Sequence, residues 1–160
     1  MPLYEYYSVS DPALDRLWGD FWQCQSFTPV VAHTITSVKL TMYRLGLPGT
    51  LDVSIKATDG SGLPTGVDLA SGSTNADALP ESYSAEKREV SLGAGVALLA
   101  GTKYEIVVHA ASGDQNNYVR WRHKSPSCYP RGTHGFSSDG GVTWEEELTR
   151  DMMFEEWGNP

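Results

Sequence analysis

Apolar and polar residues alternate along most of this chain, and this period of two constrains its fold more than any other feature. Leu51, Val53 and Ile55 would lie on one face of a strand, while Asp52 and Ser54 would lie on the other. Successive side chains of a strand point to opposite faces of a sheet, so the pattern predicts half-buried antiparallel strands. The predicted strands are 21–28, 38–43, 51–57, 69–74, 87–92, 103–108, 118–123, 135–138 and 151–157.

Turn residues separate the predicted strands, as in the runs DGSG at 59–62 and DGG at 139–141. About 8–10 short strands joined in this way predict an all-β fold, an antiparallel two-sheet β-sandwich of jelly-roll-like form. At most one short helix is expected, over 11–18, where Asp11 could be the N-cap and Pro12 the first helical residue. The weakly patterned segment 71–86 is predicted to be a long exposed loop.

The charge balance excludes two classes of partner. The chain has 20 acidic and 12 basic residues and a net charge of −8. A nucleic-acid backbone or an anionic membrane surface requires a basic face, so we expect no nucleic-acid partner. Apolar runs fall short of the ~18–20 residues that cross a bilayer, so no membrane insertion is expected.

The sequence gives no support for an enzyme, and no catalytic residue is predicted. It contains neither a G-x-S-x-G nucleophile motif nor a glycine loop that opens a helix to bind phosphate. Neighbouring acids such as Glu145 and Glu146 would point to opposite faces of a strand, whereas glycoside hydrolysis needs two carboxylates that face one substrate.

No cofactor or metal site is predicted. His123, Cys128 and His134 lack the spacing of a zinc module. Calcium is kept as an alternative because several loop positions carry carboxylates, which would otherwise cap their own turns: Asp59, Asp68, Asp77 and Asp114. Cys24 and Cys128 could form one disulfide or remain free thiols.

One predicted strand carries a candidate binding surface. Tyr118, Arg120 and Arg122 would share one face of it, and this stripe could stack on a sugar ring or pair with carboxylates. Alternatively, the stripe pairs across strands with the acids of 151–155. Trp121 would point to the other face, which favours a place in the core. The candidate ligand-binding residues are Tyr118, Arg120, Trp121, Arg122 and Tyr129.

The chain is divided here into an aromatic N-terminal segment, 1–19, and a single β-sandwich domain, 20–160. One core cannot easily absorb so many aromatic rings, and such residues are enriched where subunits meet. The segment is therefore either an interface arm or a flap that packs on its own domain. The candidate interface residues are Tyr4, Tyr6, Tyr7, Trp18 and Trp22.

A local motif, S-x-D-x-G-x-T-W, comprises Ser137, Asp139, Gly141, Thr143 and Trp144. It resembles the Asp-box of sialidase-type propellers. Asp139 could accept hydrogen bonds from turn amides, Gly141 could supply a positive φ, and Trp144 could fold back onto the hairpin. Because the motif occurs once in a short chain, it is interpreted as a structural hairpin and not as an active site.

Longer stretches resemble a jelly-roll-like β-sandwich module of bacterial surface and secreted proteins and of phage and metagenomic virion proteins. The stretches include QSFTP at 25–29, ITSVKL at 35–40, LAGTKYEIVV at 99–108 and the closing segment 151–158. The resemblance implies the fold and an accessory, adhesive or carbohydrate-binding role. It implies no catalytic residues.

We therefore expect a non-catalytic structural or adhesive protein. The leading hypothesis is a self-associating phage or virus virion component, such as a decoration, tail or fibre subunit, that forms a homo-oligomer or binds other virion proteins. The alternative is an extracellular carbohydrate-binding module with a glycan as its partner. The first residues lack the basic and apolar regions of a secretory signal, so the expected location is the virion or the extracellular space.

Overall fold

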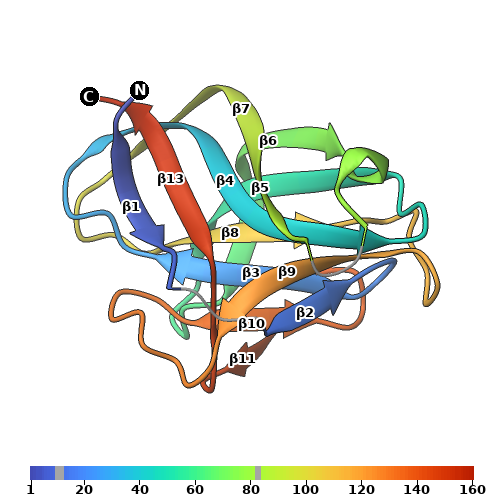
Figure 1. Cartoon of the computed structure of the whole chain (residues 1–160). Coiled ribbons are helices and arrows are strands. Elements are labelled where there is room, and N and C mark those ends of the chain that lie inside the picture. The colour runs from blue at the N-terminus through green and yellow to red at the C-terminus, as the bar shows by residue number, and fades with distance from the viewer. Residues whose placement is uncertain (10–12, 82–83) are drawn as a thin grey trace.

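The alternating segments form two antiparallel sheets that pack face to face (Figure 1). The computed structural model describes residues 1–9, 13–81 and 84–160. The predicted all-β, two-sheet antiparallel sandwich is confirmed. The seven-stranded sheet contains β1 (Leu3–Tyr7), β13 (Phe154–Asn159), β4 (His33–Leu45), β9 (Tyr118–Lys124) and β12 (Asp151–Met152), with β2 (Leu14–Leu17) beside β9 and β7 (Glu86–Leu98) beside β4.

The second sheet has six strands, and it supplies the other wall of the sandwich. Its order is β11 (Glu145–Glu147), β10 (His134–Ser137), β3 (Trp22–Phe27), β8 (Tyr104–His109), β5 (Thr50–Thr58) and β6 (Pro64–Asn75). A single 3-10 turn, η1 (Ala76–Ala78), follows β6. Sequential strands such as β5 and β6 pair directly, while β3 pairs with β8 and β10 from the second half of the chain.

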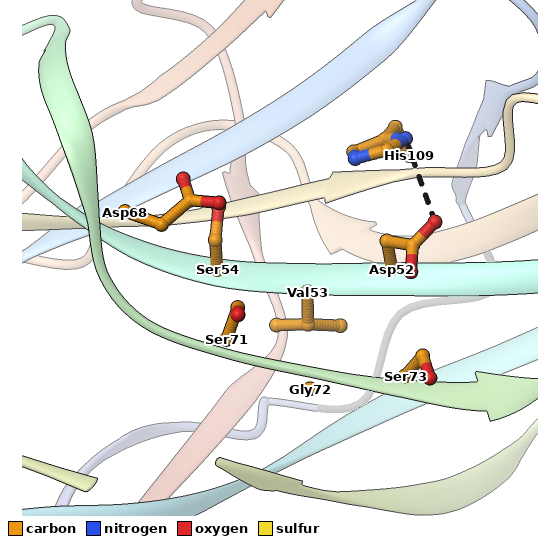
Figure 2. A pocket seen from close by; sticks show the side chains of 8 residues that line it. All are labelled: Asp52, Val53, Ser54, Asp68, Ser71, Gly72, Ser73 and His109. Carbon is orange, nitrogen blue, oxygen red and sulfur yellow. Dashed lines mark ion pairs between the residues drawn. The ribbon is translucent and has the colours of Figure 1, made fainter.

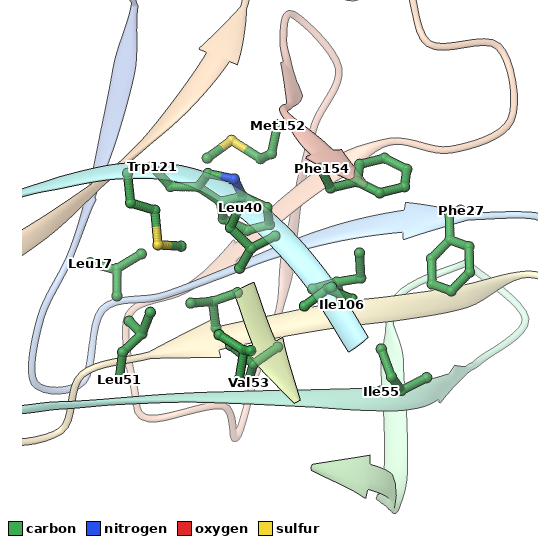
Figure 3. Packing of buried hydrophobic residues seen from close by; sticks show 14 of the residues in the cluster. Leu17, Phe27, Leu40, Leu51, Val53, Ile55, Ile106, Trp121, Met152 and Phe154 are labelled. Atoms are coloured by element: carbon green, nitrogen blue, oxygen red, sulfur yellow. The ribbon is translucent and has the colours of Figure 1, made fainter. Parts of the chain in front are cut away.

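The inward-facing side chains of both sheets form one apolar core (Figure 3). Leu51, Val53 and Ile55 of β5 are all buried, as the alternation predicts. They face the other sheet, which contributes Trp121 and Phe154. Burial of apolar area stabilises by roughly 25 cal/mol per Å², so this shared core is the main force that holds the sheets together.

Two local predictions are wrong. The segment expected to be a helix forms strand β2 over Leu14–Leu17, because pairing with β9 outweighs the local capping signals; residues 11 and 12 lie outside the described residues. The loop predicted over 71–86 is wrong at its start, because β6 continues to Asn75 in line with the strand predicted over 69–74; the next strand, β7, begins at Glu86. Small residues let this strand approach β7 closely, since a Cβ on Gly72 would lie 1.8 Å from the carbonyl oxygen of Ser91.

The described part of the N-terminal segment belongs to the seven-stranded sheet. β1 pairs with β13, and β2 pairs with β9. The ring of Tyr4 stacks on His33 with 3.7 Å between ring centroids. The guanidinium of Arg131 donates both to Glu5 Oε1 and to Glu5 Oε2, in the bidentate arrangement that gives strong ion pairs. These contacts hold β1 against the rest of its own domain.

The hairpin that follows β10 is held by the carboxylate of Asp139 and by the hydroxyl of Ser137, which accepts a hydrogen bond from the Gly141 amide at 2.9 Å. Asp139 Oδ1 accepts hydrogen bonds from the amides of Val142 and Thr143 at 3.1 and 2.9 Å, and Asp139 Oδ2 accepts one from the Thr143 hydroxyl. The Thr143 hydroxyl and amide are the main reason that the pKa of Asp139 falls to about 2. Gly141 has a φ of +82°, and Trp144 lies edge-on to Trp22.

Replacing Gly141 with alanine should destabilise the protein by about 1–3 kcal/mol. Its positive φ disfavours any Cβ, and the added carbon would lie 2.7 Å from Cζ3 of Trp22. Urea denaturation measures this loss directly. The matched control is Gly60→Ala, because no atom lies within 4 Å of a Cβ at Gly60. Equal stability of the two variants would contradict the packing of the hairpin on Trp22.

Candidate functional site

A groove lies where strand β2 of one sheet faces β3 and β10 of the other. It consists of two adjoining hollows of about 260 and 400 Å³ that share Asp15 and Gln23. The first, called the polar hollow, is lined by Asp15, Gln23, His134, Phe136, Glu147 and Arg150. The second, called the aromatic hollow, is lined by Asp15, Arg16, Trp18, Phe21, Gln23 and Gln115.

In the polar hollow, Arg150 fixes both carboxylates. Its guanidinium nitrogens lie 2.7 Å from Asp15 Oδ1 and 3.1 Å from Glu147 Oε2. The hydroxyl of Thr149 also donates to Glu147, and this bond is the main reason that the pKa of Glu147 is lowered. Both carboxylates are therefore held in fixed positions by Arg150 in the wall of the hollow.

His134 lines the same hollow as a neutral imidazole. Burial lowers its pKa to about 4. Its Nε2 lies 2.6 Å from Gln23 Oε1, a carbonyl oxygen that can only accept, so the proton is on Nε2 and Nδ1 bears the lone pair. His134 Nδ1 and Asp15 Oδ2 are buried and have no hydrogen-bond partner among the described residues. A buried acceptor left unpaired costs about 1–3 kcal/mol.

The aromatic hollow adds an apolar surface to this polar wall. The rings of Trp18 and Phe21 lie 5.1 Å apart between centroids, and Phe21 is 41% exposed. The Gln23 amide is fixed because its Nε2 donates to the carbonyl oxygen of Arg16 at 2.8 Å. The groove thus places the exposed ring of Phe21 and the half-buried ring of Trp18 beside oriented amide, carboxylate and guanidinium groups.

A separate shallow hollow of about 270 Å³ lies on the outer face of β5, β6 and β8 (Figure 2). It combines Asp52, His109 and several serines, which are the residue types of a hydrolase triad. However, His109 Nδ1 lies 4.0 Å from Asp52 Oδ2, beyond hydrogen-bond reach. The imidazole instead stacks on Trp22 at 3.9 Å, and burial lowers its pKa. Within the described residues, no serine hydroxyl bonds to it.

The stripe predicted on β9 divides between the surface and the core. Arg120 and Arg122 are half-exposed on the outer face, as the alternation predicts. Tyr118 is buried, and the guanidiniums of Arg16 and Arg120 lie over its ring. Trp121 is 0% exposed and its Nε1 donates to the carbonyl oxygen of Met153 at 2.7 Å. Tyr129 is buried against Phe154. Burial therefore takes Trp121 and Tyr129 out of the candidate ligand-binding set.

The acidic ladder proposed as the partner of this stripe does not form. β13 pairs with β1 and β4, so its acids do not lie opposite Arg120 or Arg122. β12 reaches only the end of β9, and the carboxylate of Asp151 there accepts hydrogen bonds from the loop at 127–129. The residue opposite Arg120 on β2 is another arginine, Arg16.

The candidate interface residues mostly pack within the domain. Tyr7 is buried and its hydroxyl lies 2.7 Å from Cys128 Sγ. Tyr4 and Trp22 stack on His33 and His109, and Trp18 packs on Phe21. Tyr6 differs from the other four because it is 55% exposed.

The described residues contain no group of three or more histidine, cysteine, aspartate or glutamate side chains that could hold a metal ion. Of the acids considered for calcium, Asp59 and Asp114 accept hydrogen bonds from amides of their own turns. Asp77 accepts one from the amide of Gly49, and Asp68 forms an ion pair with Lys56.

The two cysteines do not form a disulfide. Cys24 is buried and Cys128 is exposed. In the part of the chain that the structure describes, no helix has the length and apolarity needed to span a bilayer.

Neither the comparison with protein-family models nor that with curated proteins finds a match for this chain. The assignment of the groove as a binding site therefore depends on its geometry alone. The sequence patterns did not identify Asp15, Gln23 or Arg150 as site residues; Glu147 was considered only among the neighbouring acids of 145–147, and His134 only for zinc. No local motif marks them, because they meet only when β2 pairs with β9 and β10 pairs with β3.

Proposed function

We propose that this chain is a non-catalytic binding module that holds a carbohydrate in the groove. The observation that carries the proposal is the pair of buried acceptors, His134 Nδ1 and Asp15 Oδ2, which accept no hydrogen bond from the described residues. They line the groove beside the half-buried ring of Trp18 and the exposed ring of Phe21, and the nearest printed contact of Asp15 Oδ2 is His123 Nε2 at 3.7 Å. A sugar has hydroxyl groups that can donate to such acceptors, and it has an apolar C–H face that can pack on an aromatic ring.

The charges in the groove support binding without catalysis. A glycosidase needs one carboxyl group free to donate a proton and a second free to act on the substrate. Here Arg150 engages both Asp15 and Glu147. Residues held in this way are suited to fixing the orientation of a ligand.

Replacing Trp18 with alanine should raise the Kd for a bound glycan at least about ten-fold, because the ring surface for stacking is lost. A panel of neutral polysaccharides in affinity gel electrophoresis would identify the ligand, and calorimetry would give the Kd. Tyr6→Ala is the matched control, since it removes an exposed aromatic ring from β1. Failure of the protein to bind any glycan, or equal effects of Trp18→Ala and Tyr6→Ala, would overturn the proposal.

A self-associating structural subunit, such as the virion component expected from the sequence, is the second candidate. It is favoured by the edge of β1, which pairs only with β13 among the described strands and carries the exposed side chains of Leu3 and Tyr6. An open edge with apolar side chains can pair with a second copy. Light scattering after size exclusion should then show an oligomer that Tyr6→Lys dissociates, whereas a monomer at high micromolar concentration would argue against it.

A further inference from the structure

Three arginines lie together on the outer face of the seven-stranded sheet. Arg120 and Arg122 belong to β9, and Arg16 lies directly opposite Arg120 on β2, which runs beside β9 (Figure 1). We call this set the arginine face. None of the three forms an ion pair with a carboxylate of the described residues. The chain's other arginines each form one: Arg44, Arg88, Arg131 and Arg150.

The arginine face is unfavourable by itself. Residues directly opposite on antiparallel strands have Cβ atoms about 5 Å apart, and like charges at such positions repel. The Nε atoms of Arg120 and Arg122 are buried without a hydrogen-bond partner. The chain has a net charge of −8, yet no carboxylate of the described residues pairs with these arginines. An external anion that pairs with the terminal guanidinium nitrogens would relieve the repulsion.

The ring of Tyr118 holds two of these arginines in place before an anion binds. The Cζ atoms of Arg16 and Arg120 lie 5.5 and 5.6 Å from the centroid of its ring. Cation–π contacts at this distance restrict the side chains of both arginines. Restricting them before a ligand arrives reduces the entropy lost on binding.

We propose that the arginine face binds the carboxylate or sulfate groups of an anionic polysaccharide. A guanidinium can donate two parallel hydrogen bonds to either group, a geometry that lysine lacks. Arg16 also lines the aromatic hollow, so one sugar chain can extend from the groove over this face. The choice of a carbohydrate as carrier of the anions rests on the proposed function, whereas the anion site rests on the arginines alone.

The double variant Arg120→Gln/Arg122→Gln should bind anionic polysaccharides at least about ten-fold more weakly than the parent chain. The probes are polygalacturonate for carboxylate, dextran sulfate for sulfate, and dextran as the neutral chain. Binding of the parent protein should weaken as salt is added, because ions screen exposed charges over about 10 Å at 0.1 M. Lys103→Gln is the matched control, since it removes one positive charge outside the arginine face and should leave the Kd unchanged.

The unliganded double variant should melt at the same temperature as the parent chain or at a higher one, because it removes like-charge repulsion. This result would show that the variant is folded.

Unchanged affinity of the double variant for both anionic probes would overturn the anion site. So would a parent chain that binds neither probe. Self-association that the double variant abolishes would assign the face to a second copy instead. Loss of anion binding with neutral-glycan binding retained would support both proposals. Anion binding that depends on the arginines, without any neutral-glycan binding, would overturn only the groove.

Discussion

Replacing Trp121 with alanine should lower the free energy of unfolding by about 3–5 kcal/mol, which is close to the whole stability of many domains. The side chain is the largest of those that are fully buried, and it packs among residues of both sheets (Figure 3). The substitution leaves a cavity and also removes the hydrogen bond from Nε1 to the carbonyl oxygen of Met153. For a chain of this length the melting temperature should fall by about 10 °C.

Trp121→Phe separates the two contributions of this residue. Phenylalanine keeps much of the apolar volume but leaves the Met153 carbonyl without its donor, so its cost should be smaller, about 1–3 kcal/mol. Circular dichroism during heating measures both variants. If Trp121→Ala left the melting temperature unchanged and weakened glycan binding instead, Trp121 would have to be a ligand platform and its placement in the core would be wrong.

The alternation of β5 predicts its structure because pattern and environment agree there. Leu51, Val53 and Ile55 face the core and Asp52 faces outward, so a local rule suffices. The same rule orients Arg120 and Trp121 correctly on opposite faces of β9. It fails at β2, where the apolar positions Leu14 and Leu17 have helical spacing and the strand forms only through pairing with β9.

The groove could not be predicted from the sequence, because its residues come from distant segments. Asp15 and Arg150 are separated by most of the chain and meet as an ion pair only after both sheets have formed. The same is true of Gln23 and His134, whose hydrogen bond depends on the register of β3 and β10. Residue types alone identified Arg120 and Arg122 as binding candidates, but the absence of an acidic partner depends on which strand lies beside β9.

Replacing Asp151 with alanine should destabilise the protein by about 3–5 kcal/mol. The side chain is fully buried, and its Oδ2 accepts hydrogen bonds from the Ser127 hydroxyl at 2.7 Å and from the amides of Cys128 and Tyr129 at 2.8 Å. Gln25 Nε2 lies 3.4 Å from the other oxygen. Loss of this acceptor leaves several buried donors without a hydrogen-bond partner.

Two further variants test this explanation at Asp151. Ser127→Ala removes one of the donors and should cost only about 1 kcal/mol, while Asp151→Asn keeps an acceptor oxygen and should fall between the two. Urea denaturation measures the free energy of unfolding of all three variants. Limited proteolysis should cut the segment 125–131 fastest in Asp151→Ala, because the Asp151 carboxylate holds the backbone of that segment by hydrogen bonds. If Ser127→Ala were as damaging as Asp151→Ala, the Ser127 hydroxyl and not the two amide bonds would hold the loop. Because Arg131 in this loop binds Glu5 of β1, loss of the anchor should also loosen the β1 edge and speed hydrogen exchange there.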